Sequence, residues 1–196
     1  MDTWDKKVKV GGKLTPKKKV LDYYTKLWKR DPSFRNQVKK RGIFVRANYG
    51  NSSVIRRKNI KINTLDDLKK VVHEHGVEFI APTNNIDKSV IDIDMPKRYI
   101  PKKRQISRTV VNNLKKRGIK VSMVTDAPRG AHIFSRASKG DIRKALKDIA
   151  KEDKNKRFYV GKSSNKKIVL DPSEPNIAVP NSLSIKGKPY KKWKKV

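Results

Sequence analysis

The segment Ser89-Val-Ile-Asp92-Ile-Asp94-Met-Pro96 combines an apolar run with two acids that are two residues apart. In a β-strand, side chains at i and i+2 point to the same face, so Asp92 and Asp94 are expected to project together while the isoleucines pack on the other face. Two neighbouring carboxylates repel each other unless a cation lies between them, and Mg²⁺ or Mn²⁺ bound to phosphates is such a cation. A lone Asp-x-Asp also fits an edge strand that exposes two acids, so the rest of the chain must decide.

The charge of the chain indicates the kind of partner. The 196 residues include 51 Lys and Arg against 18 Asp and Glu, a formal net charge of +33. Self-repulsion on this scale destabilises a compact fold unless a polyanion compensates it, and nucleic acid is the expected polyanion. A membrane surface is the weaker option, because the cations are spread along the chain and not gathered on one amphipathic helix.

Cellular location and redox chemistry are bounded by what the sequence does not contain. We see no apolar stretch of about 18 residues to span a bilayer and no signal peptide pattern. The absence of cysteine excludes disulfides, Cys-ligated zinc and thiol catalysis. We therefore expect an intracellular protein, in the cytoplasm or nucleoid, encoded by a cell, a virus or a plasmid.

Alternating strand and helix patterns predict an α/β or α+β sandwich in one domain over residues 1–196. The apolar spacing predicts helices over residues 16–28, 64–76, 104–117 and 138–150. Strands are predicted over residues 42–47, 55–62, 77–81, 89–94, 119–124, 131–134, 158–160, 167–171 and 177–179. Residues 1–15 and 187–196 are expected to be flexible basic tails.

Two further segments resemble the ends of strands that carry polar groups. Thr125-Asp-Ala-Pro-Arg129-Gly130-Ala-His132 is a turn between two predicted strands, and Ile168-Val-Leu-Asp171 is a second apolar run that ends in an acid. Three carboxylates suffice to hold two divalent ions, one for the attacking hydroxyl and one for the leaving pyrophosphate. In the turn, glycine lets the backbone approach a phosphate while Arg129 and His132 donate hydrogen bonds, although His132 also fits a structural role.

The order of these motifs resembles that of the archaeo-eukaryotic primases, and most closely the polymerase domain of bacterial ligase D and its stand-alone archaeal relatives. The resemblance covers roughly residues 13–190. It is carried by Phe44-Val-Arg46, Asn48-Tyr-Gly50 and Lys58, by Thr64-Leu-Asp-Asp-Leu68 and Gly76-Val-Glu78, by Asp87 to Pro96, by Thr125 to His132, and by Val179-Pro-Asn-Ser182-Leu with Lys186 and Lys188.

The resemblance implies a primase-polymerase-like mixed sheet with flanking helices. It also implies a metal-dependent nucleotidyltransferase that adds nucleotides to a 3′-hydroxyl in DNA replication priming or repair. Template and primer DNA, nucleoside triphosphates and ligase, replication or repair proteins are the implied partners. Carried over by position, the implied site consists of the metal-holding acids Asp92, Asp94 and Asp171, the triphosphate contacts His132, Arg129 and Gly130, and the further phosphate contacts Lys58, Ser182 and Lys186. The implied cofactor is a pair of Mg²⁺ or Mn²⁺ ions.

Two other function classes stay open on the residues alone. A non-catalytic DNA- or RNA-binding protein would account for the net charge, the Lys-rich end of the chain and its aromatics through backbone contacts and base stacking. Such a protein gains nothing, however, from acids at strand ends that face a polyanion. A metal-dependent nuclease or phosphoesterase would use the same carboxylates but lacks support from the His132 turn.

Overall fold

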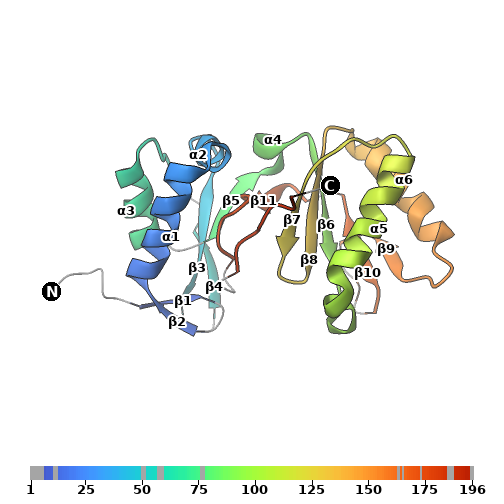
Figure 1. Ribbon diagram of the computed structural model, residues 1–196, viewed down its shortest axis with the longest axis horizontal. Helices are drawn as coiled ribbons and strands as arrows, with labels where there is room; N and C mark the ends of the chain where they lie inside the picture. Colours follow the sequence, from blue (N-terminus) through green and yellow to red (C-terminus); the bar gives the residue numbers. More distant parts are fainter. Residues whose placement is uncertain are drawn as a thin grey trace. The chain divides into compact units, whose positions relative to one another are not determined.

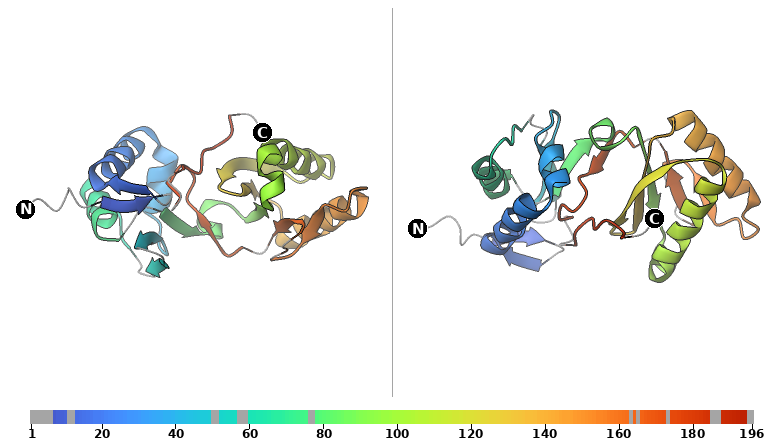
Figure 2. Two further views of the ribbon diagram at one scale, coloured as in Figure 1. Left: turned by 90° about the horizontal axis from the view of Figure 1, so that it is seen from below. Right: turned by 45° about the horizontal axis from the view of Figure 1, so that its top comes forward.

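The computed structural model of the chain describes residues 7–10, 13–49, 52–56, 60–75, 78–162, 164, 166–172, 174–184 and 188–194. The chain folds into two compact units. Unit 1 takes the described residues up to Ile86 together with Asn176–Tyr190, and unit 2 takes those of Asp87–Pro175 together with those from Lys191 onward. The prediction of one catalytic domain over residues 1–196 stays a prediction. Figures 1 and 2 trace the elements of both units.

Unit 1 is built on a four-stranded antiparallel sheet with helices packed against it. The strand order is β11-β5-β3-β4. Its elements are β3 (Phe44–Tyr49), β4 (Ser52–Arg56), β5 (Glu78–Pro82), β11 (Asn176–Ala178), α1 (Lys17–Arg30), α2 (Pro32–Val38), α3 (Leu65–His75) and α4 (Thr83–Ile86), beside a separate hairpin of β1 (Lys7–Val10) and β2 (Lys13–Pro16). The rings of Tyr24, Phe34 and Phe79 are fully buried at the centre of the core.

Unit 2 contains a five-stranded sheet of order β7-β8-β6-β10-β9. Its elements are β6 (Ser89–Asp94), the 3₁₀ helix η2 (Lys97–Lys102), α5 (Lys103–Lys116), β7 (Val121–Ala127), β8 (Gly130–Ser135), α6 (Lys139–Glu152), β9 (Phe158–Val160) and β10 (Ile168–Asp171). All neighbouring strands are antiparallel except β9 and β10. The apolar sides of α5 and α6 pack with alternate residues of β6, β8 and β10 in one core.

The mixed α/β fold class is confirmed, but three local predictions differ from the structure. The strand expected over residues 55–62 is wrong in its bounds, because β4 ends at Arg56 and residues 60–62 are not in a strand. The sequence predicts that Asp31-Pro32 breaks the first helix; it does end α1, but it also begins α2, since the Asp31 carboxylate accepts a 3.1 Å hydrogen bond from the Phe34 amide. Part of the expected N-terminal tail forms the β1–β2 hairpin.

The basic segment near the end of the chain is packed and not solvated, so the prediction of a flexible tail is wrong for residues 188–194. Tyr190 and Trp193 are both buried. In unit 1 the Tyr190 hydroxyl donates to the buried Glu78 carboxylate. In unit 2 the Trp193 amide donates to the Val124 carbonyl at 2.9 Å, and its indole N–H donates to Asp126 at 3.2 Å. The lysines dominate the composition of this segment, but its aromatic residues decide its structure.

Replacing Trp193 by Ala is expected to lower the free energy of unfolding by about 3 kcal/mol, because the change empties a core position and removes the indole donor of Asp126. Urea unfolding followed by circular dichroism measures this loss. Lys194→Ala, at the exposed neighbouring residue, is the control and should leave the midpoint unchanged. Equal urea midpoints for the two variants would contradict the packing of Trp193 and support the prediction that residues 188–194 are a flexible tail.

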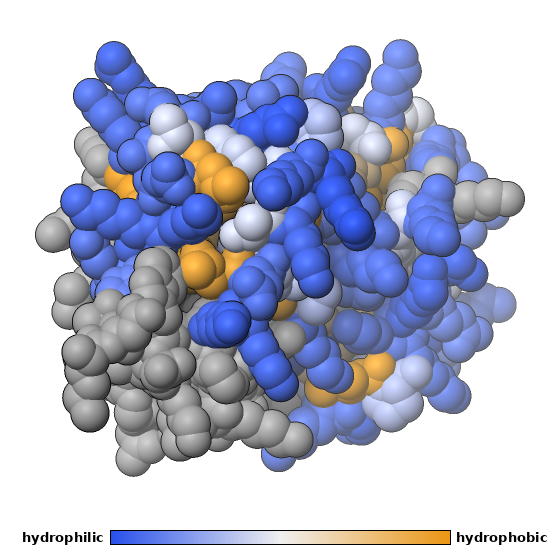
Figure 3. Space-filling view, turned by 60° about the vertical axis from the view of Figure 1, so that its left-hand side comes forward, coloured by the Kyte–Doolittle hydropathy of each residue, from blue (hydrophilic) through white to orange (hydrophobic). Residues whose placement is uncertain are grey.

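The outer surface is dominated by charged and polar side chains. On the face displayed in Figure 3, hydrophilic residues predominate and apolar ones form only small, separate patches. Among the described residues, Tyr159 is the large apolar side chain left exposed, at 44%. No helix in the described parts of the chain is long and apolar enough to cross a membrane. The described part of the surface therefore offers charge rather than apolar area to a partner.

Candidate metal and nucleotide site

Strand β6 lies in the middle of the unit 2 sheet and presents its acids on the face opposite the helices. Ile91 and Ile93 are fully buried in the core beneath α5 and α6. Asp92 and Asp94 alternate with them and are only partly buried. The expectation that the two acids share one face of a strand is thus met, and the strand is central rather than at an edge.

Strand register brings residues from three segments of the chain side by side. Asp92 lies directly opposite His132 on β8 and directly opposite Asp171 on β10. Asp94, one pleat further along, lies opposite Gly130. Paired residues in antiparallel strands have Cβ atoms about 5 Å apart. Asp92, Asp94, Asp171 and His132 therefore share one patch of the sheet, which we call the acidic patch.

His132 is held between a carboxylate and a hydroxyl. Its Nε2 lies 3.5 Å from Asp92 Oδ1, and its Nδ1 lies 3.5 Å from the hydroxyl of Thr125, the residue opposite it on β7. Burial lowers the pKa of His132 to about 3, so the imidazole is neutral near pH 7. A neutral imidazole has one N–H, and a Thr125 hydroxyl that donates to Nδ1 leaves this hydrogen on Nε2, toward the acids.

Asp92 is the acid of this group whose charged form is disfavoured by its surroundings. Burial, followed by the neighbouring carboxylates of Asp94, Glu174 and Asp171, raises the pKa of Asp92 to about 7, and Arg129 opposes this shift. A carboxylate in this position gains stability from any cation that neutralises the group. The side chain keeps 29% of its surface exposed, so an ion can reach it.

Arg129 lies in the two-residue turn at the tip of the β7–β8 hairpin and contacts the acid at the end of β6. Its Nε lies 3.2 Å from Asp94 Oδ1, and its Nη2 donates to Asp94 Oδ2. The Arg129 side chain is 58% exposed and that of Asp94 is 39% exposed. The guanidinium is therefore an exposed cation at the border of the acidic patch.

Gly130 allows β6 and β8 to pair beside this patch. A Cβ at Gly130 would lie 1.7 Å from the carbonyl oxygen of Ile93, far inside van der Waals contact. Only glycine lets the two backbones approach at this point. The close approach is with the protein's own strand, a different use of glycine from the phosphate contact that the sequence indicates.

The remaining predicted residues lie elsewhere. Ser182 is buried in unit 1, where its hydroxyl donates to the Phe79 carbonyl at 3.4 Å. Lys58 and Lys186 lie outside the described residues. Sequence reasoning missed Thr125 and Glu174; the signals that could have found them are the seven-residue hairpin spacing to His132 and the acid three residues after Asp171.

The acidic patch is not a closed metal cage. Among the described residues, no group of three or more His, Asp or Glu side chains stands in an arrangement that could by itself hold a metal ion. Carboxylate oxygens are nevertheless the donors that Mg²⁺ and Mn²⁺ prefer, and sites for Mg²⁺ complete their shells with water and substrate phosphates. The chemistry of the donor set and the raised pKa of Asp92 fit a divalent ion.

In metal-free buffer, the Asp92 carboxyl is expected to make the wild type less stable as pH rises. Its pKa is raised on folding, so the folded state retains a proton that the unfolded state loses from about pH 4 upward, and the loss of stability is complete above about pH 7. Asp92→Asn does not titrate, so its melting temperature should exceed that of the wild type by a margin that widens from pH 5 to pH 8. Calorimetry in EDTA measures the margin, with Asp148→Asn on the exposed side of α6 as control. A margin independent of pH would contradict the raised pKa.

Comparison with known proteins identifies the fold. No protein-family model matches the sequence, and no curated protein matches it. Among solved structures, the polymerase domain of Mycobacterium tuberculosis ligase D in complex with DNA matches with a TM-score of 0.63 and 13% sequence identity, over 98% of this chain and 85% of that one. The chain thus has a fold similar to that of a ligase D polymerase domain, which agrees with the primase-polymerase-like fold expected from the motifs.

Proposed function

We propose that the protein is a metal-dependent nucleotidyltransferase, a primase or polymerase that adds nucleotides to the 3′-hydroxyl of a nucleic acid. The observation that carries this proposal is the register that aligns Asp92 with both Asp171 and His132 across three neighbouring strands. Such a constellation provides acids for cations and an imidazole for phosphate on one face of the sheet. DNA replication priming or repair inside the cell is the corresponding process, with DNA and nucleoside triphosphates as partners.

Each side chain of the patch has a role in this reaction. Asp92, Asp94 and Asp171 would hold two Mg²⁺ or Mn²⁺ ions, which when bound neutralise charge on the triphosphate and activate the 3′-hydroxyl. The neutral His132, positioned by Thr125, offers its Nε2 hydrogen to a phosphate oxygen without adding a buried charge. The exposed Arg129 guanidinium can turn from Asp94 to the triphosphate. Gly130 keeps the strands paired beneath these groups.

Lys58, Ser182 and Lys186 stay in the proposal as further phosphate contacts only through the resemblance to the primase family. The buried hydroxyl of Ser182 gives this assignment the least support, because the Phe79 carbonyl already accepts its hydrogen bond. Ligase, replication or repair proteins likewise remain proposed partners.

Primer extension tests the proposed function. A labelled primer–template is incubated with NTPs or dNTPs and Mn²⁺, and the wild type is compared with Asp92→Ala/Asp94→Ala. We expect stepwise extension by the wild type and none by the variant, while fluorescence anisotropy shows that DNA binding is retained. Asp66→Ala/Asp148→Ala removes two exposed acids elsewhere and controls for the change in net charge.

The alternative functions give different results in the same assay. A non-catalytic basic binding protein would bind DNA tightly without extension under any nucleotide or metal, and the Asp92→Ala/Asp94→Ala change would have no effect beyond that of its charge control. A metal-dependent nuclease would shorten the primer. Either result would overturn the proposal.

A further inference from the structure

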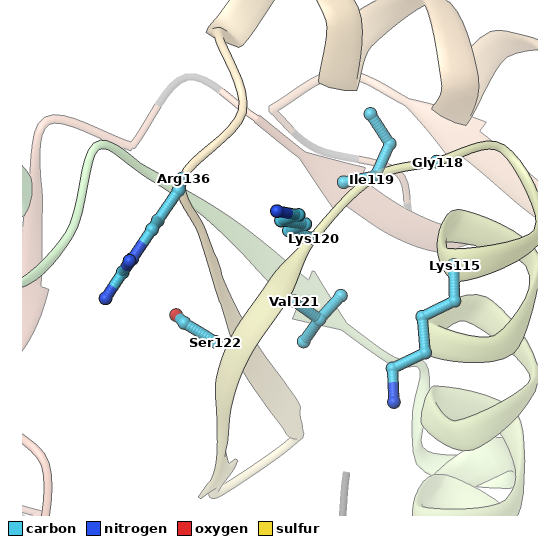
Figure 4. A pocket seen from close by; sticks show the side chains of 7 residues that line it. All are labelled: Lys115, Gly118, Ile119, Lys120, Val121, Ser122 and Arg136. Carbon is cyan, nitrogen blue, oxygen red and sulfur yellow. The ribbon is translucent and has the colours of Figure 1, made fainter.

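The pocket at the start of strand β7 is lined by three cations from three separate segments of unit 2. It has a volume of about 640 Å³ and is lined by Lys115, Gly118, Ile119, Lys120, Val121, Ser122 and Arg136. Lys115 belongs to the last turn of α5, Lys120 precedes β7, and Arg136 follows β8. Figure 4 shows Lys115 and Arg136 on opposite sides of β7.

The three cations are exposed and lack acidic partners. Within the described residues, no ion pair involves Lys115, Lys120 or Arg136. Among the described residues no acid lines the pocket; Asp87 lies next to it and accepts a hydrogen bond from the Ser122 hydroxyl. All three line one pocket and none is neutralised by an acid in an ion pair among the described residues, so the positive potential there favours an anion.

The turn at Gly118, between Lys115 and Lys120, leaves open space beside the backbone. Gly118 ends α5 with a φ of +75°, a conformation that L side chains rarely adopt, and its amide donates to the Lys115 carbonyl at 3.0 Å. This turn brings the segment back so that Lys115 and Lys120 border the same pocket. A Cβ at Gly118 would have no atom within 4 Å, so the space above the turn is open.

An extended peptide that pairs with the β7 edge is the less suitable occupant. Between Val121 and Met123 the β7–β8 register is broken by a bulge, and from Val124 onward the outer edge of β7 is already paired with residues 191–193. Bulges and exposed lysines are devices that prevent strand addition at a sheet edge. A row of phosphates needs no backbone pairing and is matched by lysine and arginine side chains.

We propose that this pocket binds phosphates of a nucleic-acid backbone and anchors the strand at a second site on unit 2. The inference rests on the proposed function in that it adds a contact for the same class of substrate. The pocket lies at the opposite end of β8 from Gly130, about 17 Å away at about 3.3 Å per residue, so it can be changed without altering the acidic patch.

The test measures DNA binding without chemistry. Fluorescence anisotropy follows a labelled 20-base-pair duplex, used as the probe, between about 50 and 200 mM KCl without nucleotide or divalent metal. For Lys115→Ala/Lys120→Ala/Arg136→Ala we expect at least about a tenfold loss of affinity and a salt slope that is smaller by about 3, one for each lost phosphate contact. Lys144→Ala/Lys147→Ala/Lys151→Ala on the exposed side of α6 removes the same charge and should change affinity less than about threefold.

The outcomes separate this inference from the proposed function. Equal losses of DNA affinity in the two variants would show that only net charge determines binding and would overturn the proposal that the pocket binds phosphates. An unchanged affinity for DNA combined with a lost affinity for an Asp/Glu-rich peptide would overturn it in favour of a protein partner. If the protein does not extend primers but the two variants differ in DNA affinity as expected, the phosphate-binding pocket is supported and the polymerase function is overturned. If the protein extends primers but the two variants do not differ, the polymerase function is supported and the pocket is overturned. Melting temperatures of both variants confirm that they fold.

Discussion

Asp171→Asn is expected to reduce primer extension by about 10³-fold, which corresponds to about 4 kcal/mol of transition-state stabilisation. Asp171 is 7% exposed and lies directly opposite Asp92, so it completes the acidic patch from the neighbouring strand. The amide preserves the shape of the side chain but removes the negative charge that a divalent ion requires. Single-turnover extension at saturating DNA measures the loss, and anisotropy should show unchanged DNA binding.

Glu174→Gln is the matched control for Asp171→Asn. Glu174 contributes to the raised pKa of Asp92 through its charge but does not belong to the paired strands. We expect its extension rate to stay within about tenfold of the wild type, since a nearby charge is worth less than a metal-holding carboxylate. Similar losses in both variants would mean that the total negative charge, and not the strand register, determines activity.

Gly130→Ala is expected to lower the free energy of unfolding by about 3 kcal/mol or more, because the new methyl group would overlap the Ile93 carbonyl. The two strands would have to separate where Asp94 and Arg129 meet, so extension should be lost even at temperatures at which the variant is folded. Chemical denaturation together with extension at 10 and 25 °C measures both effects.

Gly140→Ala provides the control for the glycine substitution. Gly140 lies in the first turn of α6, and the nearest atom to its added Cβ is the Ser138 hydroxyl oxygen at 3.7 Å. Alanine should therefore leave stability unchanged or raise it by up to about 1 kcal/mol. Comparable destabilisation of both variants would contradict the close approach of β6 and β8.

The geometry within each segment could be predicted from the sequence, but the pairing between segments could not. The alternation of Ile and Asp in β6 is a local property and predicts which side chains share a face. Which residue of β10 lies opposite Asp92 depends on strand register, which is set by packing between residues almost 80 positions apart. The role of Gly130 in strand pairing is hidden for the same reason, because its neighbour Ile93 lies on another strand.

Composition was misleading where a few residues outweigh many. Residues 188–194 contain four lysines and read as a solvated tail, yet two buried aromatic side chains hold the segment in place. Burial of large aromatic side chains stabilises the folded chain by more free energy than the ordering of the exposed lysines costs in conformational entropy. The helix α2 was missed because Asp31-Pro32 is both a breaker and a starting signal, and the sequence alone favours neither.

The way in which the chain alternates between the two units has a consequence for biosynthesis. Strand β11, which completes the sheet of unit 1 beside β5, is made only after the whole of residues 87–175. During translation β5 therefore has an uncovered edge while unit 2 is already emerging, and uncovered strand edges promote aggregation. A nascent chain arrested before residue 176 should need a chaperone to remain dispersed, whereas a chain extended through residue 190 should not.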